Sequence, residues 1–220
     1  MQKGISCILA AMALLATAEA RATTLTYDFD RNNSTLIGGP WAKITLSDDA
    51  NDGRVHVTVD LLEAGYDSIG SSFGLQDFYF NENTGDADFA TNVSILFSSP
   101  STWTSQYSSS SAMGGVGYGK FELLNSGSGS DRANPLDFYL SSLAGPLSAA
   151  NFAVTSPQTK YMFAGHIGDF SDVGIHGETY DSAQFASGTP SAPVPEPGTM
   201  LLVGASLLGL AVYTKRRETA

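Results

Sequence analysis

Apolar and polar residues alternate with a period of two through the middle of this chain, and helical periodicity is almost absent. The clearest runs are residues 25–29, 43–46 and 55–61, in which every second side chain is hydrophobic. A strand with this alternation turns one set of side chains into a core and the other toward water. Between the second and third runs, the step from Asp52 to Gly53 favours a hairpin turn. The pattern therefore predicts an all-β, antiparallel domain.

Further short runs of the same kind complete the expected domain. They are residues 77–81, 93–97, 119–124, 136–140, 152–154 and 161–167. About nine short strands of this kind pack most naturally as an antiparallel β-sandwich or a jelly-roll-like fold. One helical turn is expected within 143–151, and long loops are expected at 98–117 and 126–130. Six phenylalanines in the strand-like runs are expected in the core: Phe29, Phe78, Phe80, Phe121, Phe138 and Phe163.

Both ends of the chain carry apolar runs. Lys3, the apolar residues 5–18 and the small residues up to Ala22 are typical of a signal peptide, which the Sec translocon exports and signal peptidase removes. The uncharged run 199–214 precedes a basic triplet, which predicts a membrane-spanning helix with stop-transfer charges on its cytoplasmic side. The expected segments are a signal peptide at 1–22, a β-sandwich ectodomain at 23–186, a Pro/Ser-rich linker at 187–198, a single C-terminal transmembrane helix at 199–214 and a basic cytoplasmic tail at 215–220.

The C-terminal tail has three parts in a fixed order: Pro195-Glu196-Pro197, the apolar run, and Lys215-Arg216-Arg217. In this order it resembles the PEP-CTERM sorting signal of Gram-negative bacteria. The resemblance implies an exported protein that is held in the inner membrane, processed near the Pro-Glu-Pro motif by an exosortase, and passed to the cell surface or extracellular matrix. The alternative is an ordinary C-terminal membrane anchor behind a proline-rich hinge.

The middle of the chain is also similar to an ectodomain common among PEP-CTERM proteins. The similarity lies in short motifs that begin at Trp41, Gly53, Phe78, Gly117, Leu136 and Phe163. It implies a secreted β-sandwich and assigns the domain no reaction.

Composition excludes several classes of function for the part of the chain between the apolar ends. The one cysteine, Cys7, lies in the expected signal peptide, which excludes disulfides, thiol catalysis and cysteine-based zinc sites in the domain. The whole chain has a net charge of −11, and the five basic and two acidic residues outside 23–197 leave −14 for that stretch. Such a charge argues against nucleic acid or anionic lipid as partners and favours solubility, with loosely associated Ca²⁺ as the one cofactor worth considering.

Two motifs suggest catalytic or metal chemistry. Residues 70–74 fit the Gly-x-Ser-x-Gly pattern of a serine hydrolase centred on Ser72, although the residues that follow read as a strand, where a nucleophile elbow needs a helix. His166, Asp169, Asp172 and His176 combine imidazoles and carboxylates, which can bind a divalent metal or move protons. Their spacing fits no closed metal motif, so a structural role for His166 at a strand end is the favoured interpretation.

Two acidic segments suggest calcium, and one aromatic pair suggests a sugar ligand. Residues 48–52 and 81–88 gather carboxylates and amides. The first segment fails the EF-hand pattern because Gly53 stands where a ligand is needed, and solvated turns are the alternative for both. Trp103 and Tyr107 stand in a serine-rich stretch. Exposed rings there would stack on sugars, whereas folded-back rings would cover the edge of the sandwich.

These observations favour an exported, non-enzymatic surface or matrix protein that is processed by an exosortase and has no catalytic residues. A module that binds carbohydrate, such as exopolysaccharide, is the alternative. A hydrolase or a metal-dependent enzyme is the third hypothesis.

Overall fold

The computed structural model describes residues 23–49, 52–83, 88, 92–108, 118–125, 129–157 and 159–187. The expected signal peptide, the linker after Ser187, the apolar run 199–214 and the basic tail lie outside these residues. Among the described residues, no helix is both long and apolar enough to cross a membrane.

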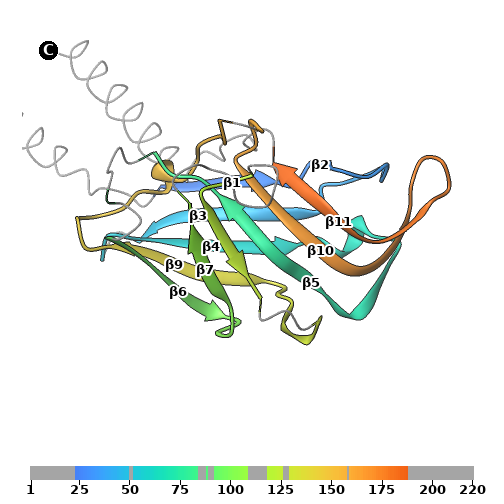
Figure 1. The fold of residues 1–220 in the computed structure, drawn as a ribbon, viewed down its shortest axis with the longest axis horizontal. Coiled ribbons are helices and arrows are strands. Elements are labelled where there is room, and N and C mark those ends of the chain that lie inside the picture. Colours follow the sequence, from blue (N-terminus) through green and yellow to red (C-terminus); the bar gives the residue numbers. More distant parts are fainter. Residues whose placement is uncertain are drawn as a thin grey trace, which may run out of the picture.

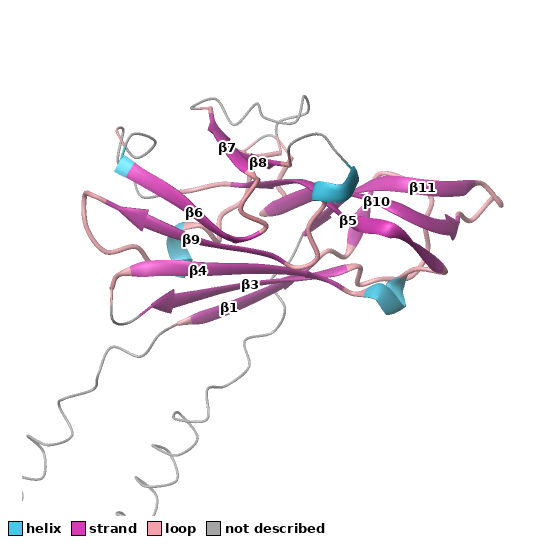
Figure 2. Ribbon diagram, turned by 90° about the horizontal axis from the view of Figure 1, so that it is seen from below, coloured by secondary structure: helices cyan, strands magenta, loops and turns pink. Residues whose placement is uncertain are grey.

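Two antiparallel sheets form the domain (Figures 1 and 2). The first has five strands in the order β1-β3-β4-β9-β6, and the second has six in the order β2-β11-β10-β5-β8-β7. The strands are β1 (Thr24–Asp28), β2 (Arg31–Asn32), β3 (Ala42–Asp49), β4 (Arg54–Leu61), β5 (Ser68–Phe80), β6 (Val93–Ser99), β7 (Thr104–Tyr107), β8 (Phe121–Leu124), β9 (Leu136–Ser142), β10 (Phe163–Val173) and β11 (Thr179–Ser187). The prediction of an antiparallel all-β domain is confirmed.

The β3–β4 hairpin shows how the alternating pattern determines the register. Its pairing runs from Ala42 opposite Leu61 to Asp49 opposite Arg54, and alternate side chains of both strands are buried. Gly53 has a φ of +67°, a left-handed conformation that glycine adopts without steric cost. The turn expected near Gly53 is therefore confirmed.

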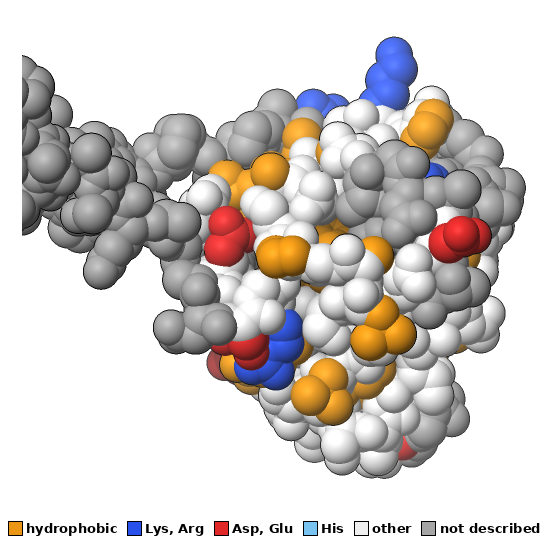
Figure 3. All heavy atoms as spheres, turned by 90° about the vertical axis from the view of Figure 1, so that its left-hand side faces the viewer, with side chains coloured by type: hydrophobic (Ala, Val, Ile, Leu, Met, Phe, Trp, Pro, Cys, Tyr) orange, Lys and Arg blue, Asp and Glu red, His pale blue; other side chains and the backbone are white. Residues whose placement is uncertain are grey.

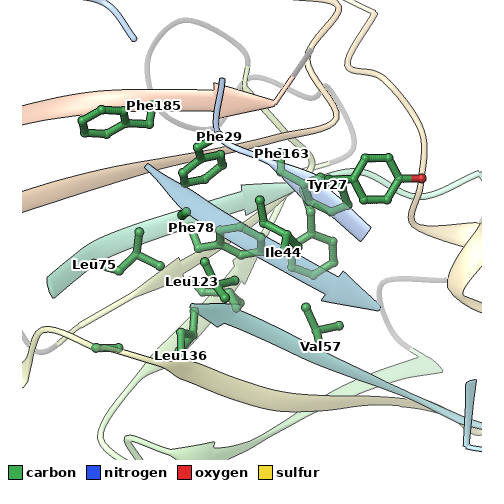
Figure 4. Close-up of a cluster of buried hydrophobic side chains, with 14 of the residues drawn as sticks. Tyr27, Phe29, Ile44, Val57, Leu75, Phe78, Leu123, Leu136, Phe163 and Phe185 are labelled. Carbon is green, nitrogen blue, oxygen red and sulfur yellow. The ribbon is translucent and has the colours of Figure 1, made fainter. Parts of the chain in front are cut away.

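One hydrophobic core lies between the two sheets (Figure 4). Tyr27 of the first sheet packs against Phe163 of the second with ring centroids 5.1 Å apart, and Phe78 packs edge-on against Phe138 at 6.3 Å. Burying a large apolar side chain contributes roughly 1.5–3 kcal/mol. All six phenylalanines that the sequence assigned to the core are at most 3% exposed, so that prediction is confirmed.

Several boundaries differ from the prediction. β5 is thirteen residues long and includes residues 68–76, and β7 lies inside the segment expected as a loop at 98–117. β11 was not predicted. Residues 152–154 form no strand: Phe152 is fully buried at the end of a 3-10 turn, which explains its apolar character without a strand.

Three short 3-10 helices join strands in the described part of the chain: η1 (Glu63–Gly65), η2 (Gly129–Asp131) and η3 (Ala149–Asn151). The last confirms the turn expected within 143–151, and Ser148 and Asn151 form a capping box around it. η2 overlaps the end of the loop expected at 126–130.

Figure 3 shows one end of the molecule. Among the described residues on this face, hydrophobic side chains are scattered over an otherwise uncharged surface, with a few acidic and basic side chains between them.

Candidate functional site

The Gly-x-Ser-x-Gly motif lies in the middle of β5 and does not form a nucleophile elbow. β5 continues as a strand from Ser68 to Phe80, so no helix follows Ser72. The Ser72 backbone N–H donates to Asp169 Oδ2 at 2.6 Å, and Arg132 Nη1 donates to the Ser72 carbonyl at 3.1 Å. The strand–turn–helix geometry of a nucleophile elbow is therefore missing around Ser72.

Close packing explains the glycines of the motif. A Cβ at Gly70 would lie 2.4 Å from the carboxylate of Asp169, and a Cβ at Gly74 would lie 2.8 Å from Cβ of Arg132. These distances are shorter than real contacts, so both positions need glycine to let the neighbouring side chains approach β5.

The four metal candidates do not converge on one point. His166, Asp169 and Asp172 lie along β10, and His176 lies in the turn that follows it. The Asp169 carboxylate accepts a hydrogen bond from the backbone N–H of Ser72, and the Asp172 carboxylate accepts one from the backbone N–H of Val173 at 2.8 Å. Within the described residues, no group of three or more His, Cys, Asp or Glu side chains is placed to hold a metal ion.

In the first calcium candidate, the described carboxylates are bound to the protein itself. Asp48 accepts from the backbone N–H of Ala149 at 2.5 Å and of Thr23 at 3.3 Å. Asp52 accepts from the Arg54 N–H at 3.1 Å, and the Arg54 guanidinium pairs with Asp52 and, at 3.7 Å, with Asp49. These contacts support the turn interpretation, while Asn51 lies outside the described residues.

In the second calcium candidate, Glu82 is buried and forms an ion pair with Lys120 at 2.7 Å. The Asn81 side-chain amide donates to the Tyr118 carbonyl at 3.4 Å. Residues 84–87 of this segment lie outside the described residues.

Trp103 is buried, so it does not provide the exposed platform for a sugar ring that the carbohydrate hypothesis required. It is 4% exposed, its indole N–H donates to the Asp131 carbonyl at 2.9 Å, and it packs against Phe97 with centroids 6.4 Å apart. Tyr107 is partly buried and packs edge-on against Phe121 at 4.9 Å. Both rings fold back onto the sandwich because burial of their apolar faces against the core is more favourable than exposure to water.

A cluster of titratable side chains lies on the outer face of the six-stranded sheet. We call Asp77, Tyr79, Glu122 and His166 the outer-face cluster. Asp77 and Tyr79 alternate along β5 with the core residues Phe78 and Phe80. Glu122 lies opposite Tyr79 on β8, and His166 lies opposite Asp77 on β10.

Hydrogen bonds connect this cluster across three strands. The Tyr79 hydroxyl donates to Glu122 Oε1 at 2.7 Å, and the His166 backbone N–H donates to Asp77 Oδ1 at 2.8 Å. Beside it, the Tyr118 hydroxyl donates to Gln184 Oε1 at 2.8 Å, and its ring lies 5.8 Å from that of Tyr79. These hydrogen bonds therefore fix the side chains of Asp77, Tyr79 and Glu122 on the outer face.

Burial changes the acid–base properties of the cluster. Burial raises the pKa of Asp77 to about 6, and the nearby negative charge of Glu122 raises it further. Hydrogen bonds from the His166 backbone N–H and from the Tyr79 side chain lower it. Burial and the charge of Arg132 lower the pKa of His166. Burial also raises the pKa of Tyr79. The cluster can therefore bind or release a proton near pH 6.

The sequence alone did not identify this cluster, although a signal existed. Polar residues at positions 77 and 79 between large apolar ones mark an outward face, and a tyrosine on such a face needs a partner for its hydroxyl. The partners, Glu122 and His166, come from other strands, so only the sheet order reveals them.

Comparison with known proteins identifies one segment. The model of the PEP-CTERM protein-sorting motif matches residues 193–217. No curated protein and no solved structure matches the chain significantly. The match confirms the resemblance of the tail, because it includes Pro195-Glu196-Pro197, the apolar run and Lys215-Arg216-Arg217.

Proposed function

We propose that this chain, which carries a PEP-CTERM sorting motif, is a non-enzymatic ectodomain that is exported, held briefly in the inner membrane, processed by an exosortase and delivered to the cell surface or extracellular matrix. The observation that carries the proposal is the motif match at residues 193–217. The match includes all three parts of the tail, which an ordinary membrane anchor does not require.

The tail suits a temporary anchor. The sixteen residues 199–214 carry no charge. As a helix they would span about 24 Å, at about 1.5 Å per residue, against a hydrocarbon core of about 30 Å. Lys215, Arg216 and Arg217 would remain in the cytoplasm, which places Pro195-Glu196-Pro197 on the outer side, where the exported domain lies. A signal peptide at 1–22 supplies the export step.

The non-enzymatic role of the domain is supported by what its polar groups do. Asp169 and Arg132 hold the backbone of Ser72, Asp48 holds the turn at Ala149, and Trp103 closes the sandwich edge. Each of these side chains is accounted for by a structural contact.

Replacement of Pro195-Glu196-Pro197 by Gly-Ser-Gly tests the sorting step. We expect the full-length variant to accumulate in the inner membrane, while the wild type yields a mature form without residues 201–220, as measured by fractionation and mass spectrometry. The matched control replaces Thr189-Pro190-Ser191, which precedes the matched segment, by the same tripeptide and should be processed normally. Normal processing of the first variant would refute the sorting proposal.

Exopolysaccharide is the proposed partner at the surface. If the processed protein is retained by this polymer, enzymatic degradation of the polymer on intact cells should release it into the medium. Retention that is unchanged after complete polymer degradation would contradict this partner and leave the sorting step untouched.

A further inference from the structure

β6 is the longest edge strand among those the structure describes. The four edge strands of the two sheets are β1, β6, β2 and β7, with five, seven, two and four residues. β6 pairs with β9 on one side and, within the described residues, has no strand on the other (Figure 2). An edge of this length presents backbone N–H and C=O groups to a further strand.

Two devices that usually protect such an edge, charged side chains and proline, are missing from the described residues of β6. Residues 93–99 contain no charged side chain and no proline. The core-facing Val93, Ile95 and Phe97 are only partly buried, and the outward-facing Leu96 is 61% exposed. A bulge relative to β9 occurs only after Phe97, so the first five residues remain regular. Such an uncharged, apolar edge favours association with another strand.

The order of residues in β6 is symmetric about Leu96. Ile95 and Phe97 flank it, and Ser94 and Ser98 flank these in turn. If two copies of this strand run antiparallel with Leu96 opposite Leu96, then Ile95 of each copy lies opposite Phe97 of the other. Directly opposite residues point to the same face of a sheet. The apolar pair would therefore extend the core side, and both Leu96 side chains would meet on the outer side.

We propose that β6 pairs with β6 of a second copy of this chain, which joins two five-stranded sheets into one ten-stranded sheet. The symmetry of β6 about Leu96 supports a second copy as the occupant. The chain has a net charge of −11, so two copies repel one another over most of their surface. An uncharged, self-complementary edge is where they can approach without facing like charges.

Disulfide trapping tests the contact on the purified full-length chain with Cys7→Ser as background. Cβ atoms of directly opposite residues lie about 4.5–5.5 Å apart, close enough for a disulfide after small adjustments. Leu96→Cys should give a covalent dimer under mild oxidation. Ile175→Cys is the matched control, because Ile175 is 64% exposed in the described turn between β10 and β11. At least a tenfold higher dimer yield for Leu96→Cys is expected, and equal yields would overturn the proposal.

A charge exchange tests the register. Leu96→Lys and Leu96→Glu place like charges opposite each other in the homodimer, so each variant alone should be monomeric by analytical ultracentrifugation. An equimolar mixture should form a heterodimer, and Ile175→Lys should leave the wild-type dimer intact. A mixture that remains monomeric, or single variants that remain dimeric, would overturn the proposal. This test uses purified protein and does not depend on sorting.

Discussion

At the scale of single residues, Gly70 and Asp169 depend on each other. Asp169 has a φ of +62°, an uncommon conformation for a residue with a side chain, and this places its carboxylate against β5. The carboxylate accepts the N–H of Ser72 and occupies the space beside Gly70. The glycines of the Gly-x-Ser-x-Gly pattern are thus explained by the close packing of neighbouring side chains against β5.

Gly70→Ala should therefore destabilise the domain. The added methyl group would displace the Asp169 carboxylate and break its bond to Ser72, a loss of roughly 1–3 kcal/mol in the free energy of unfolding. Gly129→Ala is the control, because a Cβ there meets only Ser72 Cβ at 3.9 Å. In an Asp169→Gly background, Gly70→Ala should cost little by urea unfolding. If Gly70→Ala lowers the free energy of unfolding as much in that background as in the wild type, the Asp169 carboxylate is not the cause.

Asp77 should make stability depend on pH. Its pKa is raised to about 6 by burial, so between about pH 4 and 6 the native state binds a proton that the unfolded state has released. Stability should therefore fall as the pH rises through this range, by at most about 3 kcal/mol, since one pKa unit corresponds to about 1.4 kcal/mol.

Asp77→Asn isolates this effect. The amide keeps an oxygen acceptor for the His166 N–H and cannot ionise, so the melting temperature between pH 4 and 7 should vary less than in the wild type. Asp181→Asn, at an exposed position of β11, is the control and should leave the wild-type profile unchanged. Identical profiles for wild type and Asp77→Asn would contradict the raised pKa.

At the scale of elements, the sequence predicts the strands that carry large apolar side chains in alternation. β4 is predicted because valines and a leucine mark its inner face. β11 is missed because small residues, such as Ala183 and Ala186, occupy buried positions and weaken the pattern. β7 is missed because its residues are polar and its hydrogen bonds to β8 come from the tertiary fold. Local pattern therefore predicts strands with large alternating apolar side chains better than strands built from small or polar residues.

Trp103 illustrates the same limit for sites. From the sequence, Trp103 could be exposed or folded back onto the sandwich edge, and its contacts with Phe97 and the Asp131 carbonyl show that it is folded back. The outer-face cluster was missed for a related reason, because its members come from β5, β8 and β10. Contacts between separate elements of the fold determine both outcomes.

Trp103→Ala should accordingly act on stability. Truncation of a buried tryptophan typically costs about 3–5 kcal/mol. Leu143→Ala, at a side chain that is 87% exposed, should cost less than about 0.5 kcal/mol and serves as the control. Urea unfolding followed by circular dichroism measures both. If the two variants unfold alike, Trp103 does not close the edge of the sandwich.

At the scale of the whole molecule, the distance between the folded domain and the sorting motif is set by the length of the chain. The last described residue, Ser187, is paired with Phe163 and fully buried. Seven residues, 188–194, separate it from Pro195. They can span at most about 25 Å, at about 3.3–3.6 Å per residue. This length limits the room that a membrane protease has between the folded domain and the motif.

Deletion of residues 188–192 should therefore slow processing without affecting the fold. Only two residues would remain between Ser187 and Pro195, which span at most about 7 Å, so the domain would block access to the motif. Pulse-chase labelling should show a longer-lived full-length form, and the melting temperature should be unchanged. Replacement of the same five residues by Gly-Ser-Gly-Ser-Gly should restore the wild-type rate, because chain length and not sequence provides the reach. If the deletion is processed at the wild-type rate, the protease reaches the motif beside the folded domain, and the linker has no spacing role.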